Sequence, residues 1–130
     1  MPELDGVHHV ALTVTDLAAS RAWYERLFDA QVMWEENGDG HGFVALFVPP
    51  FVIGLHTHDK TPDGDYFAES RVGLDHASFG VPDRKALDAW AAHLDELAIA
   101  HSPITEAPYG TVLVFRDPDN IQLEFYALPG

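Results

Sequence analysis

The chain has 130 residues, of which 47% are hydrophobic and 22% charged, a balance that suits a folded domain and excludes a disordered chain. Its 21 acidic and 7 basic residues give a formal charge of −14, which excludes the basic surface that nucleic acid or an anionic membrane requires. No apolar run approaches the ~20 residues of a membrane helix, and no signal peptide is recognisable. Cysteine is absent, so disulfides are excluded. We therefore expect a cytoplasmic protein. Eight histidines direct attention to metal binding.

The most informative feature of the sequence is an internal repeat at a constant offset of 67 residues, the interval from 6 to 73. Segment 6–27 matches segment 73–94 in residue types that rarely coincide by chance. The recurring pairs are Gly6 and Gly73, His9 and His76, Val14 and Val81, Asp16 and Asp83, Ala22 and Ala89, Trp23 and Trp90, and Leu27 and Leu94. The chain therefore contains two copies of one structural unit.

Each copy opens with a strand, because apolar residues alternate with polar or small ones after His9 and again after His76. Asp16 and Asp83 then stand where the N-cap residue of a helix belongs. Apolar residues at helical spacing predict helices over about 17–28 and 84–98. Three strands are expected after each helix, near 30–36, 42–48 and 51–57 in the first copy and near 102–105, 110–116 and 121–126 in the second.

Turns complete the pattern, with a glycine-rich segment at 37–40 and a second turn at 117–120. The prediction is an α+β fold built from two βαβββ modules. Module one covers about 6–57, a polar linker covers 58–72, and module two covers about 73–126.

Three side chains of these modules form a candidate metal site. His9 and His76 begin equivalent strands, and the apolar alternates of each strand are expected to pack on the module's own helix, so both imidazoles face the other side of the sheet. Glu124 alternates with Leu123 and Phe125 in the last strand and faces the same side. If the two sheets curve toward each other, two imidazoles and one carboxylate converge, a ligand set that accepts one divalent ion of Zn, Ni, Co, Mn or Fe(II).

The motifs around these residues resemble a known family. His9 is followed seven residues later by Asp16-Leu17, His76 precedes Asp83 by the same interval, and the chain closes on the sequence DPDNIQLE at 117–124. From residue 6 to 126 the chain resembles the vicinal oxygen chelate superfamily, which includes glyoxalase I, methylmalonyl-CoA epimerase, fosfomycin-resistance enzymes, extradiol dioxygenases and bleomycin-resistance proteins.

The resemblance implies a single glyoxalase-like domain over 1–130, in which the paired modules form an open, U-shaped mixed sheet with helices on its outer face. By resemblance, His9, His76 and Glu124 fall on the family's metal-ligand positions. The resemblance also implies a homodimer, and an open sheet that needs covering favours the same assembly.

Three positions depart from the named branches of the family. Four-ligand lyases and epimerases carry Glu or Gln on the fourth strand of the first module, where this chain has Gly54. Extradiol dioxygenases carry Tyr three residues before the turn Asp, where this chain has Val114. Fosfomycin enzymes carry Thr two residues after the first His, where this chain has Ala11. The usual general base is therefore unassigned.

Further candidates surround the triad. His56 lies two residues beyond Gly54 on the same strand face and is a candidate base or substrate contact, set against the alternative of a solvated strand-end histidine. Gln122 and Tyr126 share the face of Glu124 and are candidate substrate contacts. His8 should point away from the cleft, and the remaining histidines are expected on the surface: His41, His58, His93 and His101.

The leading functional hypothesis is a divalent-metal-dependent, glyoxalase-like lyase or isomerase that binds vicinal oxygens of a small substrate, with Glu124 and His56 as catalytic candidates. Its first alternative is a single-domain Fe(II) extradiol-type dioxygenase, since two histidines and a carboxylate suit oxygen activation equally well. The second alternative is a metal-free, bleomycin-resistance-like binding protein, against which the complete triad argues.

Overall fold

The structure is a computed structural model that describes residues 1–130. The chain forms two compact units, Met1–Asp65 and Tyr66–Gly130, and the boundary between them lies inside the predicted linker 58–72. Each unit contains the predicted order of one strand, one helix and three strands, so the prediction of two βαβββ modules is confirmed. Neither helix has the length and apolar character that a membrane crossing needs.

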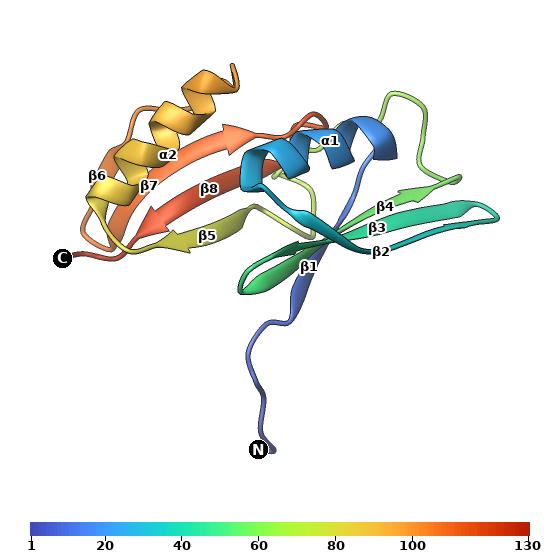
Figure 1. The fold of residues 1–130 in the computed structure, drawn as a ribbon, viewed down its shortest axis with the longest axis horizontal. Coiled ribbons are helices and arrows are strands. Elements are labelled where there is room, and N and C mark those ends of the chain that lie inside the picture. Colours follow the sequence, from blue (N-terminus) through green and yellow to red (C-terminus); the bar gives the residue numbers. More distant parts are fainter. The chain divides into compact units, whose positions relative to one another are not determined.

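Unit 1 is a four-stranded mixed sheet with one helix (Figure 1). Its strand order is β1-β4-β3-β2, with β1 parallel to β4 and the other neighbours antiparallel. Its elements are β1 (His9–Thr13), α1 (Leu17–Phe28), β2 (Gln31–Gly38), β3 (His41–Val48) and β4 (Phe51–His58).

Unit 2 repeats this architecture, with the strand order β5-β8-β7-β6 and β5 parallel to β8. Its elements are β5 (Ala77–Val81), α2 (Arg84–Glu96), β6 (Thr105–Ala107), β7 (Gly110–Arg116) and β8 (Gln122–Ala127). Because the first and last strands of each unit pair in parallel, the residues that open β1 and β5 lie beside residues of β4 and β8.

One face of each sheet packs on the helix of its own unit and forms the core. Both helices begin as predicted, with the carboxylate of Asp16 accepting from the Ala19 amide at 3.0 Å and that of Asp83 from the Ala86 amide at 2.9 Å. The buried side chains in unit 1 include Leu12, Tyr24, Leu27, Val44, Leu46, Ile53 and Leu55, and those in unit 2 include Leu87, Leu94, Leu113, Phe115, Leu123 and Phe125. The opposite face of each sheet carries both polar and apolar side chains, among them His56 and Phe43 in unit 1 and Glu124 and Val114 in unit 2.

The structure differs from the predicted boundaries in the second module. The strand expected at 102–105 begins only at Thr105, because the pairing with β7 shifts by one residue between His101, opposite Phe115, and Thr105, opposite Val112. Ser102 still pairs with Val114 through two hydrogen bonds, one from its backbone amide at 2.8 Å and one to its hydroxyl at 3.0 Å. Helix α2 ends at Glu96 rather than 98. His58 belongs to β4 rather than to the linker.

Candidate metal centre

Two predicted ligands meet on the open face of unit 2. In the register of β5 with β8, Ser78 pairs with Glu124, and the alternate residues Leu123 and Phe125 are buried on the helix side. His76 Nε2 lies 3.5 Å from Glu124 Oε1. The carboxylate side chain is 15% exposed and the imidazole 39%, so both atoms are reachable from solvent. This spacing is close to that of two ligand atoms on one ion.

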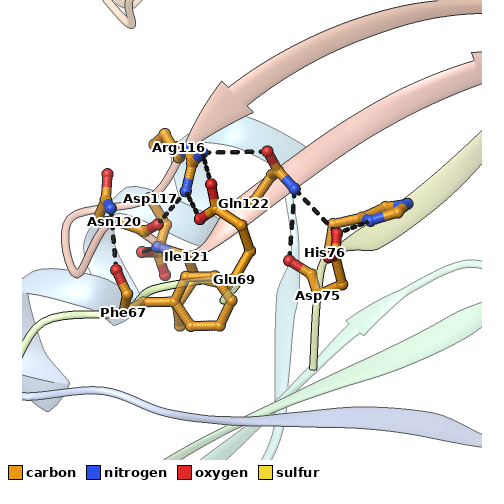
Figure 2. Close-up of polar contacts among 9 residues, drawn as sticks. All are labelled: Phe67, Glu69, Asp75, His76, Arg116, Asp117, Asn120, Ile121 and Gln122. Carbon is orange, nitrogen blue, oxygen red and sulfur yellow. Dashed lines mark hydrogen bonds and ion pairs between the residues drawn. The ribbon is translucent and has the colours of Figure 1, made fainter. Parts of the chain in front are cut away.

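The neighbouring Asp75 selects one tautomer of the imidazole. Its Oδ1 lies 2.7 Å from His76 Nδ1 (Figure 2). Because a carboxylate only accepts hydrogen bonds, the proton of neutral His76 is held on Nδ1 and the lone pair is left on Nε2, the atom nearest Glu124. A carboxylate behind a histidine is also the usual support of a metal ligand. The donor set of unit 2 therefore fits a divalent ion.

A chain of polar side chains holds Asp75 in place (Figure 2). The Gln122 amide nitrogen lies 3.3 Å from Asp75 Oδ1, and its oxygen accepts from Arg116 at 3.1 Å. Arg116 in turn binds both carboxylate oxygens of Glu69, at 2.8 and 3.0 Å. The hydrogen bonds from this guanidinium lower the pKa of Glu69 to about 2. Sequence reasoning missed this network, because Glu69 lies in a segment read as linker.

The turn that precedes β8 sets the position of Glu124 along the sheet. Asp117 is 6% exposed, and its Oδ1 accepts from the backbone amides of Asp119 at 2.9 Å and Ile121 at 2.8 Å. The Asn120 side chain donates to the Phe67 carbonyl at 3.0 Å (Figure 2). The predicted turn at 117–120 is thus an Asx turn with a buried carboxylate at its centre.

The remaining predicted contacts of unit 2 already have protein partners. Gln122 uses both ends of its amide within the network. Tyr126 lies on the open face of β8, and its hydroxyl donates to the backbone carbonyl of Tyr109. The rings of the two tyrosines also stack. His101, expected on the surface, is largely buried and contacts the Asp95 carboxylate and the Ser102 carbonyl, each at 2.7 Å.

In unit 1, His9 lies at the start of β1 and is exposed. The register of β1 with β4 pairs Ala11 with Gly54, as the register of β5 with β8 pairs Ser78 with Glu124. Gly54 is therefore the first-module equivalent of Glu124. The Nδ1 of His8, a residue expected to point away from the cleft, lies 2.8 Å from the Nδ1 of His9. His8 precedes β1, so strand alternation does not orient it.

His56 occupies the space beside that glycine. A Cβ added at Gly54 would lie 3.3 Å from His56 Nε2, while His56 Nδ1 lies 2.8 Å from His41 Nε2. Desolvation is the main cause that lowers the pKa of His56, and the charges of His41, His58 and His9 add to it. The imidazole is therefore neutral near pH 7.

Sequence reasoning placed His41 and His58 on the surface and missed that they cluster with His56. Two prolines, Pro49 and Pro50, connect β3 to β4, and their turn pairs His41 directly with His58 and Phe43 with His56. The sequence could have revealed this cluster. If the strands are paired outward from the two-residue connection, the numbers of paired residues sum to 99, which places His41 opposite His58.

Residues 6–125 match the profile of the Glyoxalase/Bleomycin resistance protein/Dioxygenase superfamily, and the chain belongs to this superfamily. An uncharacterized protein of Escherichia coli K12, YaeR, is 33% identical over 129 residues, which cover 95% of this chain and 96% of that protein. A glyoxylase/bleomycin resistance protein/dioxygenase domain from Frankia sp. EAN1pec is 39% identical with a TM-score of 0.88, covering 98% of this chain and 94% of that one.

More distant structures share the fold alone. The fosfomycin-resistance protein FosX of Listeria monocytogenes, solved with Mn(II) and sulfate, is 18% identical with a TM-score of 0.72 and coverage of 98% and 95%. The structure of a protein with this fold thus contains a divalent metal.

Proposed function

We propose that this protein is a divalent-metal-dependent enzyme of the lyase or isomerase class, which binds a small substrate through adjacent oxygens and uses His9, His76 and Glu124 as metal ligands. The observation that carries the proposal is the His76–Glu124 pair, with Nε2 freed for a metal by the Asp75 carboxylate behind Nδ1. The inclusion of His9 is supported by its position in the repeat, equivalent to that of His76, and by membership of the superfamily.

The residues divide the chemistry among them. A bound divalent ion supplies Lewis-acid stabilisation of negative charge on the substrate oxygens. Glu124 contributes the anionic ligand, and Asp75 keeps the His76 ring in one tautomer. His56 is the proposed general base, since it is neutral and its Nε2 lies beside Gly54, where no carboxylate is present. Gln122 and Tyr126 stay proposed substrate contacts on the face of Glu124.

A second candidate function is an Fe(II) dioxygenase. Gly54 provides no fourth protein ligand, and an iron ion with three protein ligands keeps positions open for substrate and oxygen, which favours this function. The metal content of protein purified under anaerobic conditions separates the two. Iron favours the dioxygenase, nickel or zinc favours the lyase or isomerase, and protein that takes up no ion after reconstitution favours a bleomycin-resistance-like binder.

The test of the metal centre is stoichiometry. His76→Ala and Glu124→Ala should each remove one bound divalent ion per chain, measured by elemental analysis after reconstitution and desalting. His93→Ala, which alters a histidine at the end of α2, is the matched control and should leave the metal content unchanged. If both ligand variants retain the metal content of the wild type, the proposed function fails.

We also propose a homodimer. Strand β2 is exposed along its length, with Trp34 60% and Met33 58% exposed, and such apolar side chains on a sheet edge need covering. A twofold pairing would cover them. Light scattering at micromolar concentration should give twice the chain mass, and Trp34→Lys should shift the protein toward the monomer. A monomeric wild type contradicts the proposal.

A further inference from the structure

We propose that His41, His56 and His58 form a second divalent-metal site, within unit 1 and separate from the ligands named above. The antiparallel register of β3 with β4 pairs His41 with His58, and it pairs Phe43 with His56. Residues two apart in a strand face the same side, so all three imidazoles lie on one face of the hairpin. That face is the open one, because the paired residues Val44 and Leu55, which point the other way, are buried on the helix side.

The distances suit one ion. One ligand atom from each of the three residues lies within 4.8 Å of the other two. His41 Nε2 and His56 Nδ1 are 2.8 Å apart, whereas two nitrogens bound at 2.0–2.1 Å in a tetrahedral zinc site lie roughly 3.3 Å apart. Binding of an ion therefore requires these two nitrogen atoms to move apart by about half an ångström. The ion then replaces the proton that the two rings share. His58 is exposed, and its ring stacks on that of His41 with the ring centroids 4.8 Å apart.

The chemistry of the three groups selects the ion. Three neutral imidazoles are borderline ligands, which suit Zn(II), Ni(II), Co(II) and Cu(II) and are poor ligands for Mg(II) or Ca(II).

The surroundings supply access and a favourable field. An open cavity of about 670 Å³ reaches His58 and is also lined by the acidic residues Asp39, Asp59 and Asp65, with Lys60 as its one basic residue. A carboxylate excess in this cavity attracts a cation toward the cluster. The chain as a whole carries a formal charge of −14, which acts in the same direction.

An ion at this site has a consequence that rests on the proposed function. If the ion takes Nδ1 of His56, the ring proton is confined to Nε2, the atom proposed to accept a proton from substrate. Occupancy of the second site should therefore inhibit the enzyme, while occupancy of the first activates it.

The experiment uses a His76→Ala/Glu124→Gln double variant, in which the first site is removed. Zn(II) and Ni(II) are titrated by calorimetry, and Co(II) absorption reports the coordination geometry. We expect about one ion per chain to remain, and we expect His41→Gln or His58→Gln, added to the double variant, to weaken binding at least tenfold. His93→Gln added to the same background is the matched control and should not change the affinity. Circular dichroism shows whether each variant is folded.

The outcomes separate the two sites. If the double variant binds no ion, or if its ion is unaffected by both His41→Gln and His58→Gln, the second site is overturned. If the wild-type metal content is unchanged by His76→Ala and Glu124→Ala but lost in His58→Gln, the proposed function fails and the second site stands.

Discussion

The buried carboxylate of Asp117 offers a quantitative test of how the second module positions Glu124. Asp117→Ala removes an acceptor that holds two backbone amides, those of Asp119 and Ile121, at 2.9 and 2.8 Å. A hydrogen bond to a charged group contributes about 1.5–3 kcal/mol. Water can partly replace the lost acceptor at the end of a turn, so we expect unfolding to become easier by about 2–4 kcal/mol in total.

Asp117→Asn separates geometry from charge, since its amide oxygen can accept the same two hydrogen bonds. We expect it to recover at least half of the loss. Asp63→Ala, at an exposed loop position, is the control and should change stability by less than about 0.5 kcal/mol.

The assay is urea unfolding followed by circular dichroism, with thermal unfolding in parallel, where a loss of about 3 kcal/mol should lower Tm by roughly 10 °C in a domain of this size. The same variants should report on the metal centre, because the turn sets the start of β8. A loss below about 0.5 kcal/mol for Asp117→Ala would refute the reasoning. Equal losses for the Ala and Asn variants would show that the negative charge, and not the acceptor position, stabilises the turn.

Three further substitutions test other parts of the structure. Gln122→Leu breaks the polar network behind the metal ligands, so metal affinity should fall about tenfold or more while circular dichroism stays unchanged, and an unaltered affinity argues against the network. The carbonyl of Ser102 and the carboxylate of Asp95 raise the pKa of His101. The two contacts therefore stabilise the folded protein fully below pH 6.5, and this contribution declines as the pH rises through the raised pKa. Asp95→Asn should therefore cost more stability, up to about 1 kcal/mol, at pH 5.5 than at pH 8.5, as urea midpoints would reveal. Gly54→Glu should tighten metal binding at the first site, because it adds an anionic oxygen, and weaken metal binding at the second site, because it displaces His56. Calorimetry on variants that lack one of the two sites should detect these opposite changes in affinity.

The sequence was sufficient for the modules because their signals are local and occur twice. Asp16 and Asp83 cap helices where the pattern predicted them, and strand alternation placed Glu124 on the face opposite α2. The boundary near 102 was wrong because the pairing with β7 shifts by one residue between His101 and Thr105, an irregularity that alternation does not reveal.

The site is less completely visible in the sequence than the fold. The partners Glu69 and Arg116 are 47 residues apart, and no periodicity predicts an ion pair over that separation. Asp75 is adjacent to His76, yet its role depends on a side-chain direction that only the structure provides. The His41–His56–His58 cluster was within reach, since the hairpin register follows from the turn that connects its strands.

The two modules have diverged in complementary ways, and the divergence explains why each candidate site lies where it does. At one equivalent position the second module carries Glu124 and the first carries Gly54. A side chain at Gly54 would meet the His56 ring at 3.3 Å, tighter than an ordinary contact, so the absence of a Cβ is what lets His56 lie there. In the second module a carboxylate occupies this position beside the His76 imidazole, whereas the first module has a glycine there with the His56 imidazole beside it. The repeat thus consists of one half with a carboxylate at this position and one half with a histidine cluster beside it.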